Sequence, residues 1–290
     1  MQVGAVFPFP LTEIGSDPAT LREYVSAAES VGYEHLSFPD HVIGVDPNRP
    51  GGWQAPYTHE SPIHEPLITL SFIAAITERI ELSTGILILP QRQTVLVAKQ
   101  AAELDLLCGG RFILGVGTGW NAVEYEVLGK DFHNRGRRME EQVALLRALW
   151  DEQSISFEGR WHHVIKAGIN PLPPRRDIPI WMGGSHERVL DRVGRIGDGW
   201  FPLRIEVSAV ESGIERIRSI AREAGRDPDA IGVQGSITTG IDVGEQVEQA
   251  KRLEAAGATH VALFTSNQGL TSAQQHIDAI RAFAEAYRKA

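Results

Sequence analysis

Short apolar runs rich in β-branched residues alternate along this chain with longer segments whose apolar residues recur at helical spacing. This alternation is typical of repeated βα units, in which helices cover a buried parallel sheet. We count about eight such units, and eight in succession predict a TIM (β/α)8 barrel. The strands are expected at residues 2–7, 35–38, 80–87, 112–116, 178–183, 199–202, 231–238 and 260–264.

The helical segments between these runs carry recognisable boundaries. Asp17 precedes Pro18, which places a capping side chain before a proline in the first turn of a helix. Gly32 and Gly257 each stand between a helix end and the next strand, where a positive φ is favoured. A chain of 290 residues could hold two domains. Because no Gly/Ser-rich or Pro-rich linker divides it, we predict a single domain over residues 1–290.

Two connections are longer than a compact barrel requires, and we treat them as insertions after strands 2 and 4. Residues 40–63 follow the second strand directly and are rich in Pro, Gly, His and aromatic residues. Residues 151–177 include an alternating stretch that predicts a small hairpin. Loops that follow barrel strands form the active-site face, so the first insertion is expected to border a site.

Composition excludes several classes of function. The net charge of −9, without a run of Lys or Arg, disfavours nucleic-acid binding. No apolar stretch is long enough to span a membrane, and the N-terminus lacks the pattern of a signal peptide. The single cysteine, Cys108, cannot form an intramolecular disulfide, which favours a cytoplasmic protein. The histidine spacings match no metal-ligand pattern, so no metal site is predicted.

Four short segments at expected strand ends carry candidate site residues. His41 follows Asp40 just after the second strand, and an imidazole in a cleft can transfer protons near neutral pH. Either that pair is functional, or Asp40 is a cap and His41 an ordinary loop residue. Gly85 ends the third strand, where glycine permits close backbone approach or a simple bulge.

The other two segments lie at the ends of the fourth and fifth strands. The run from Gly115 to Trp120 does not spell a dinucleotide fingerprint, but Gly117 and Thr118 leave room for a planar ring. Gly183, Gly184 and Ser185 lead into a helix, so their turn suits a phosphate or is simply a tight βα turn. This turn is not a nucleophile elbow, which removes the best candidate for serine hydrolase chemistry.

The segments TGILILPQRQTVLVAKQAAELDLLCGGRFILGVGTGW, SFPDHV and IPIWMGGSHERVLDRVGRIGDGWFP resemble the luciferase-like flavin and deazaflavin oxidoreductases in order and spacing. RGRRMEEQVALLRALW and FEGRWHH extend the resemblance, which covers most of the chain to about Pro202. Within that superfamily the chain looks most like the branch that uses coenzyme F420, a 5-deazaflavin hydride carrier. The resemblance implies a TIM barrel with insertions, in agreement with the alternation of strands and helices.

The resemblance also implies roles for individual residues. His41 would act in proton transfer, with Asp40 orienting it or meeting the cofactor. The Gly85–Ile86 peptide would be cis and lie against the cofactor, Gly117 and Thr118 would border its ring, and Gly183, Gly184 and Ser185 would bind its phosphate. Some relatives carry a catalytic Glu where this chain has Trp120, which leaves the proton donor open. Trp120, Trp53 and His59 are expected to line a substrate pocket, although Trp120 could also be a core residue and His59 a plain loop residue.

We therefore expect an enzyme that moves a hydride between F420 and a small organic substrate, with His41 handling the proton. One alternative is an FMN-dependent monooxygenase supplied by a flavin reductase partner, and another is a non-catalytic flavin-binding barrel. The resemblance makes a homodimer the expected assembly. The aromatic residues Trp53, Tyr57, Trp120 and Trp161 favour an apolar or planar substrate.

Overall fold

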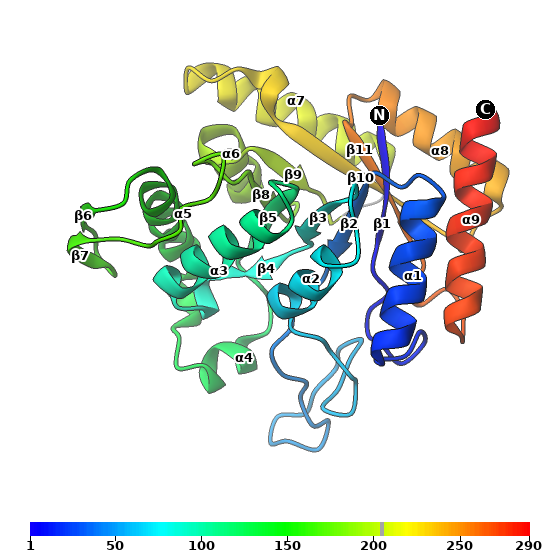
Figure 1. Cartoon of the computed structure of the whole chain (residues 1–290), viewed down its shortest axis with the longest axis horizontal. Coiled ribbons are helices and arrows are strands. Elements are labelled where there is room, and N and C mark those ends of the chain that lie inside the picture. The colour runs from blue at the N-terminus through cyan, green and yellow to red at the C-terminus, as the bar shows by residue number, and fades with distance from the viewer. Residues whose placement is uncertain (204–205) are drawn as a thin grey trace.

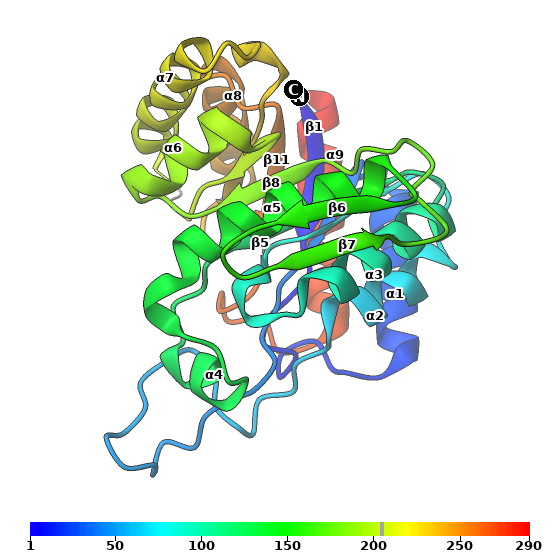
Figure 2. The same ribbon diagram turned by 90° about the vertical axis from the view of Figure 1, so that its left-hand side faces the viewer.

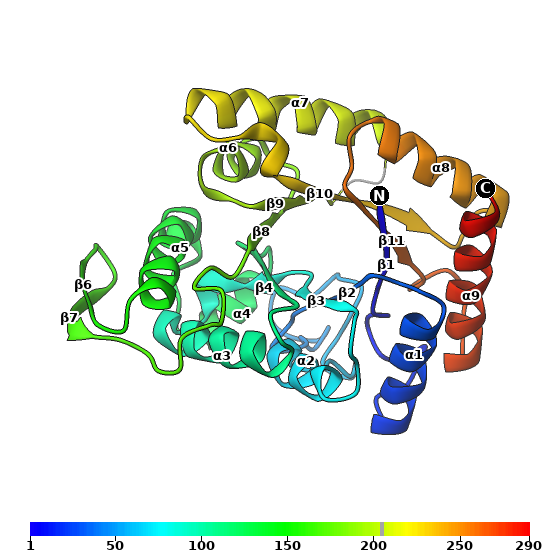
Figure 3. The ribbon, with the colours of Figure 1, turned by 45° about the horizontal axis from the view of Figure 1, so that its top comes forward.

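The computed structural model describes residues 1–203 and 206–290, and its central feature is a closed parallel barrel (Figures 1 and 3). Its sheet runs in the order β3-β2-β1-β11-β10-β9-β8-β5-β4, and an additional β3–β5 pairing closes it. The predicted TIM barrel is confirmed. The barrel strands are β1 (Gln2–Val6), β2 (His35–Phe38), β3 (Glu81–Thr84), β4 (Leu87–Ile88), β5 (Phe112–Gly117), β8 (Ile180–Gly183), β9 (Gly199–Phe201), β10 (Gly232–Thr238) and β11 (His260–Phe264).

Helices surround the barrel, and the first and last of them lie side by side (Figure 1). The Asp17 carboxylate accepts hydrogen bonds from the N–H groups of Ala19 and Thr20, so it caps the first helix as predicted. None of the helices in the described residues is both long and apolar enough to cross a membrane. They are α1 (Pro18–Ser30), α2 (Pro66–Ala74), α3 (Thr94–Leu107), α4 (Ala122–Val127), α5 (Arg135–Asp151), α6 (Glu187–Ile196), α7 (Val207–Glu223), α8 (Val243–Ala255) and α9 (Ala273–Lys289), with short 3-10 turns η1 (Leu89–Gln91), η2 (Phe132–Asn134) and η3 (Pro228–Ala230).

The third barrel strand is divided, whereas we predicted it as continuous over residues 80–87. Its two parts, β3 and β4, are separated by Gly85 and Ile86, and the peptide bond between these residues is cis, as the family resemblance implied. The Gly85 N–H still bonds the Phe38 carbonyl of β2 at 2.7 Å. The side chain of Ile86 packs against the aromatic cluster inside the barrel instead of continuing the ladder.

Two separate cores hold the barrel. The larger one lies between the strands and the surrounding helices. The smaller one consists of Trp181, Phe201 and Ile113, and Ile86 lies against it. Branched aliphatic residues usually fill such barrels. Here rings fit because glycines face them: a Cβ at Gly199 would lie 2.1 Å from the Trp181 indole.

The two insertions lie in different places. Residues 151–177 form the expected hairpin of β6 (Ile155–Glu158) and β7 (His163–Ala167), which packs outside the helices against α5 (Figure 2). The Glu141 carboxylate of α5 accepts hydrogen bonds from the N–H groups of Arg160 and Trp161 at the hairpin turn. Residues 40–63, in contrast, extend from the C-terminal end of β2 beside α4 (Figures 1 and 2). Only the first insertion therefore borders the barrel mouth.

Candidate functional site

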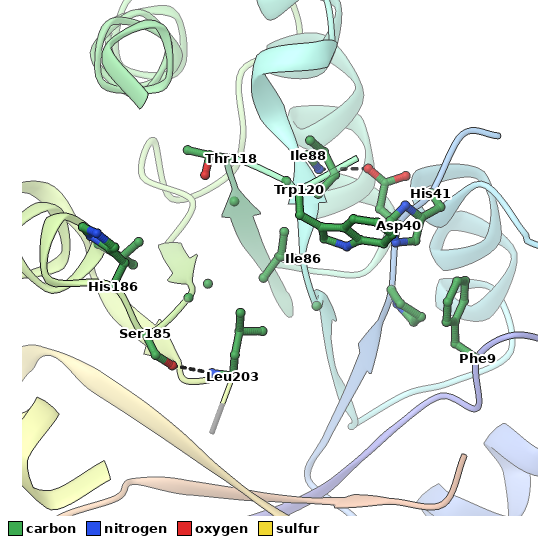
Figure 4. Close-up of a pocket in the computed structure, with 17 residues that line it drawn as sticks. Phe9, Asp40, His41, Ile86, Ile88, Thr118, Trp120, Ser185, His186 and Leu203 are labelled. Atoms are coloured by element: carbon green, nitrogen blue, oxygen red, sulfur yellow. Dashed lines mark hydrogen bonds between the residues drawn. The ribbon is translucent and has the colours of Figure 1, made fainter. Parts of the chain in front are cut away.

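A cavity of about 830 Å³ opens at the C-terminal ends of the barrel strands (Figure 4). Its volume lies within the usual range for ligand sites. The segments after β1, β2, β3, β5, β8 and β9 all contribute to it. Ten of the sequence-predicted site residues line it together: Asp40, His41, Gly85, Ile86, Gly117, Thr118, Trp120, Gly183, Gly184 and Ser185.

The centre of the cavity wall is the side chain of Ile86, which lies between the ends of β5 and β8 (Figure 4). A Cβ at Gly117 would lie 2.3 Å from Ile86 Cδ1, and one at Gly183 would lie 2.9 Å from Ile86 Cγ2. Only glycine lets both strands approach Ile86 this closely. Ile86 and these two glycines together form a shallow apolar surface. A flat ring system can lie on this surface without meeting side chains from β5 or β8.

Both carboxylate oxygens of Asp40 accept hydrogen bonds from other parts of the site. Its Oδ2 accepts a hydrogen bond from the Ile88 N–H at 2.9 Å (Figure 4), and its Oδ1 accepts one from Arg92 Nη2 at 2.7 Å. Burial raises the pKa of Asp40, while the Arg92 charge and these hydrogen bonds oppose that rise. Arg92 also bonds Glu65 at 2.7 Å. Asp40 therefore ties the loop after β2 to the third barrel strand, and neither carboxylate oxygen is free of a protein partner.

His41 is oriented by a buried carboxylate. Its Nδ1 lies 3.2 Å from Glu124 Oε2 and 2.8 Å from the Tyr57 hydroxyl oxygen. Glu124, on α4, also accepts hydrogen bonds from the N–H groups of Val42 and Ile43. Burial raises the pKa of Glu124, but the hydrogen bonds and charge of His41 and the two N–H groups outweigh burial and hold that pKa below its usual range. Glu124 is therefore ionised at neutral pH.

An ionised Glu124 determines which nitrogen of His41 is free. Because a carboxylate only accepts hydrogen bonds, the tautomer of His41 that satisfies Glu124 has its proton on Nδ1, which donates a hydrogen bond to the carboxylate. Burial, followed by the charge of Glu124, raises the pKa of Tyr57, which keeps its hydroxyl protonated. Within residues 1–203 and 206–290, Nε2 makes no hydrogen bond, and His41 lines the cavity. Nε2 is thus the nitrogen available to exchange a proton with a ligand.

Within the part of the chain that the structure describes, the turn after β8 offers free backbone donors at residues 185–187. Gly184 has φ +127° and its N–H is bonded to the Phe201 carbonyl at 3.0 Å, so this donor is used. The Ser185 hydroxyl accepts a hydrogen bond from the Leu203 N–H at 3.1 Å (Figure 4). The N–H groups of Ser185, His186 and Glu187 have no acceptor among the described residues. They stand at the start of α6, where an anion is favoured.

The three residues expected in a substrate pocket have different positions. Trp120 lines the cavity and exposes 50% of its surface. Trp53 does not line it but stacks on Trp120, with ring centroids 5.5 Å apart and an interplanar angle of 18°. His59 is exposed on the loop after β2 and is not among the residues that line the cavity, so its role in a substrate pocket stays a prediction. Its N–H is bonded to the Val45 carbonyl at 3.2 Å, which fixes its backbone in the outer part of that loop.

Sequence reasoning missed Glu124, the residue that orients His41. Asn121 caps α4 by accepting hydrogen bonds from the N–H groups of Val123 and Glu124. A Glu three residues after an Asn cap is the spacing of a capping box, which gives it an ordinary local explanation. The Glu124 carboxylate instead turns to the loop after β2. Phe9, Val189 and Leu203 also line the cavity and carried no motif that would have identified them.

Comparisons with known proteins show the family of the chain. A family model described as luciferase-like monooxygenase matches residues 1–239. A protein of Mycobacterium tuberculosis is 31% identical over 260 residues, which cover 87% of each chain. An F420-dependent glucose-6-phosphate dehydrogenase of Amycolatopsis mediterranei is 32% identical over 187 residues, or 63% of this chain and 53% of the relative.

Solved structures match the fold over the whole chain. The F420-dependent tetrahydromethanopterin reductase of Methanopyrus kandleri has a TM-score of 0.78 at 17% identity and covers 100% of this chain and 99% of its own. An F420-dependent secondary alcohol dehydrogenase has a TM-score of 0.81 at 19% identity, with 99% of each chain covered. These similarities support the fold alone. The family model, which spans most of the sequence, shows that the chain belongs to the luciferase-like monooxygenase family of oxidoreductases.

Proposed function

We propose that this protein is an F420-dependent oxidoreductase that transfers hydride between the deazaflavin and an organic substrate, with His41 as the proton-transfer group. The observation that carries the proposal is the His41–Glu124 pair at the wall of the cavity. A buried carboxylate that fixes one imidazole nitrogen leaves the other poised to give or take a proton. The F420-dependent relatives and structural neighbours support the choice of cofactor.

The residues of the cavity fit a deazaflavin. The shallow apolar surface formed by Ile86, Gly117 and Gly183 suits its flat ring system. The three N–H groups at residues 185–187 suit its phosphate. The acidic balance of the chain does not oppose this assignment, because backbone donors attract an anion without any cationic side chain.

When bound, F420 supplies the hydride acceptor or donor for the reacting carbon of the substrate. His41 handles the matching proton. As a substrate is oxidised, Nε2 takes the proton released from it, and as a substrate is reduced, Nε2 returns one. The negative charge of Glu124 stabilises the imidazolium formed during oxidation, and its hydrogen bond to Nδ1 leaves Nε2 free for the substrate. Asp40 acts on the site by holding the loop that carries His41.

Titration of the purified full-length chain with F420 and, separately, with FMN tests the cofactor. We expect a saturable change in F420 absorbance and fluorescence, and no comparable response to FMN. Tight FMN binding without an F420 response would overturn the proposal. Because free reduced FMN itself reacts with oxygen, the rate of oxygen consumption is then compared with and without protein: a changed rate would favour a flavin monooxygenase, whereas an unchanged rate would leave a non-catalytic barrel.

Replacing Glu124 with Gln tests the positioning of His41. We expect kcat to fall by about 10- to 100-fold, because the neutral amide no longer stabilises protonated imidazole, while cofactor affinity is retained. The limb of the pH–kcat profile that reports on the imidazole should move to lower pH. A merely structural role for Glu124 predicts a lower yield of folded protein with an unchanged profile, and that result would contradict the positioning role.

Glu124→Gln should also change how stability depends on pH. The pKa of Glu124 is lower in the folded protein than its ordinary value of 4.5. Its ionised form therefore stabilises the fold above the ordinary value, and this contribution is lost as the pH falls through the lowered pKa. Thermal unfolding of wild type and variant should differ most near pH 7, and the difference should shrink once the pH has fallen below the lowered pKa of Glu124. An equal difference above and below that pKa would argue against an ionised Glu124.

A further inference from the structure

The cavity has two chemically different halves. One half consists of Ile86 and the glycines at the ends of β5 and β8, together with the turn that begins α6. The other half lies beside the loops after β1 and β2 and is lined by Phe9, His41 and Trp120 (Figure 4). The first half accommodates the cofactor in the function proposed above. The second half is therefore where a substrate can meet both His41 and the cofactor.

Aromatic rings dominate this second half. Phe9 lies 5.5 Å from His41 and 5.6 Å from Tyr57, measured between ring centroids. Trp120 meets His41 and Tyr57 at 5.9 Å in edge-on arrangements. We call Phe9, His41, Tyr57 and Trp120 the aromatic box. The ring contacts among these four residues are all tilted or edge-on, and edge-on packing is favourable for aromatic pairs.

Trp120 is the exposed member of the aromatic box, and another ring packs against one of its faces. Trp53 stacks on one face of Trp120, and the Trp53 Nε1 donates a hydrogen bond to the Tyr57 carbonyl at 2.8 Å. Half of the Trp120 surface is nevertheless exposed, although indole is large and apolar. An indole held flat on one side and open on the other forms a platform for a planar ring.

Charge is sparse along the described part of the cavity wall. No Lys or Arg within residues 1–203 and 206–290 lines it, and the only acidic residue that does is Asp40. The nearby Arg92 is held by Asp40 and Glu65, both at 2.7 Å. A phosphorylated substrate in the aromatic box would lose water without gaining a cationic partner from these residues, which is costly.

We propose that the substrate is an uncharged molecule with a planar apolar ring system, which stacks on Trp120 and presents its reacting group to Nε2 of His41. The reaction named in this inference is that of the proposed function, on which it rests. The class of substrate is inferred from the aromatic box and does not depend on that function. It separates this chain from relatives that act on a sugar phosphate, such as the glucose-6-phosphate dehydrogenase of Amycolatopsis mediterranei.

Three naphthalene-derived probes test the class of substrate, with binding measured by calorimetry on the full-length protein, alone and saturated with F420. 2-Naphthol is planar and uncharged, decahydro-2-naphthol has the same carbon skeleton without planarity, and 2-naphthyl phosphate adds charge to the same ring. We expect 2-naphthol to bind about three- to tenfold more tightly than the saturated alcohol and at least about tenfold more tightly than the phosphate. Equal or tighter binding of either comparison probe would overturn the proposal.

Tryptophan variants locate the probe. Trp120→Ala should weaken 2-naphthol binding by about tenfold, whereas Trp120→Phe should remain within about threefold of wild type because it keeps an aromatic face. Trp161→Ala is the matched control, since Trp161 lies on the hairpin outside the cavity and contacts Arg160. Unchanged affinity in folded Trp120→Ala, as judged by circular dichroism, would overturn the assignment of Trp120.

The outcomes separate this inference from the proposed function. If the protein does not respond to F420 but still prefers 2-naphthol through Trp120, the cofactor assignment fails and the aromatic site stands. If F420 binds and the preference is absent, the substrate class fails and the cofactor assignment stands. Competition between F420 and 2-naphthol for one position would overturn the division of the cavity into two halves.

Discussion

Replacing His41 with alanine is expected to lower kcat by about 10²- to 10⁴-fold, the usual contribution of a positioned general acid or base. Imidazole is the commonest general acid or base in enzymes, and Nε2 of His41 has no protein partner among the described residues. Hydride transfer without it would leave the matching proton to solvent. The measurement is the change in F420 absorbance with a substrate that the wild-type protein converts.

Two comparisons make the His41 result specific. The F420 dissociation constant of His41→Ala should stay within about threefold of wild type, because the proposed cofactor half of the cavity is formed by other residues. His163→Ala is the matched control, since His163 lies on the outer hairpin beside Glu158 and should leave kcat unchanged. Turnover by folded His41→Ala at the wild-type rate would remove His41 from the mechanism.

Replacing Gly115 with alanine is expected to lower the melting temperature by about 6 to 12 °C, which corresponds to about 3 kcal/mol for a chain of this size. A Cβ at this position would lie 1.9 Å from the Thr84 carbonyl oxygen and 2.7 Å from Phe201 Cε2. The carbonyl belongs to the neighbouring strand and cannot move without breaking the β3–β5 closure of the barrel. The Thr84 hydroxyl donates a hydrogen bond to the Gly115 carbonyl at 2.6 Å, which holds the strands together at this point.

Gly129→Ala is the control for loss of glycine without a clash. Gly129 has φ +65° and no atom within 4 Å of an added Cβ, so its substitution should cost only about 1 kcal/mol from backbone strain. Circular dichroism during heating measures both variants under the same conditions. Equal melting temperatures for the two variants would show that the β3–β5 contact tolerates a side chain, contrary to this account.

Local patterns were enough to predict the barrel. Strand β2 matches the predicted residues 35–38, and β11 matches residues 260–264, because short buried parallel strands are continuous apolar runs between helical segments. The hairpin over residues 151–177 was likewise visible as alternation. The apolar pattern did not predict the break in the third strand, because Ile86 is as apolar as its neighbours; only the family resemblance implied the cis Gly85–Ile86 peptide found there.

The candidate site was predictable only as far as its residues lie at strand ends. Parallel strands bring their C-terminal ends to one face, so Asp40, Gly85, Gly117 and Gly183 had to meet there once the barrel closed. Their roles were less predictable. Asp40 and His41 are adjacent in sequence, yet Asp40 is hydrogen-bonded to Arg92 and His41 to Glu124. His59 belongs to the same loop but is exposed and is not among the residues that line the cavity.

The amino-acid sequence by itself determined the fold class, the face of the barrel that carries the site and most of the residues that line it, because these follow from periodicity and from the order of strands. Only the tertiary structure decided which groups act together. Glu124 lies 83 residues from His41 and Trp120 lies beside Trp53 from another loop, and no local pattern encodes these contacts. They depend on how two loops from different strands pack over the same barrel mouth, which is a property of the closed barrel.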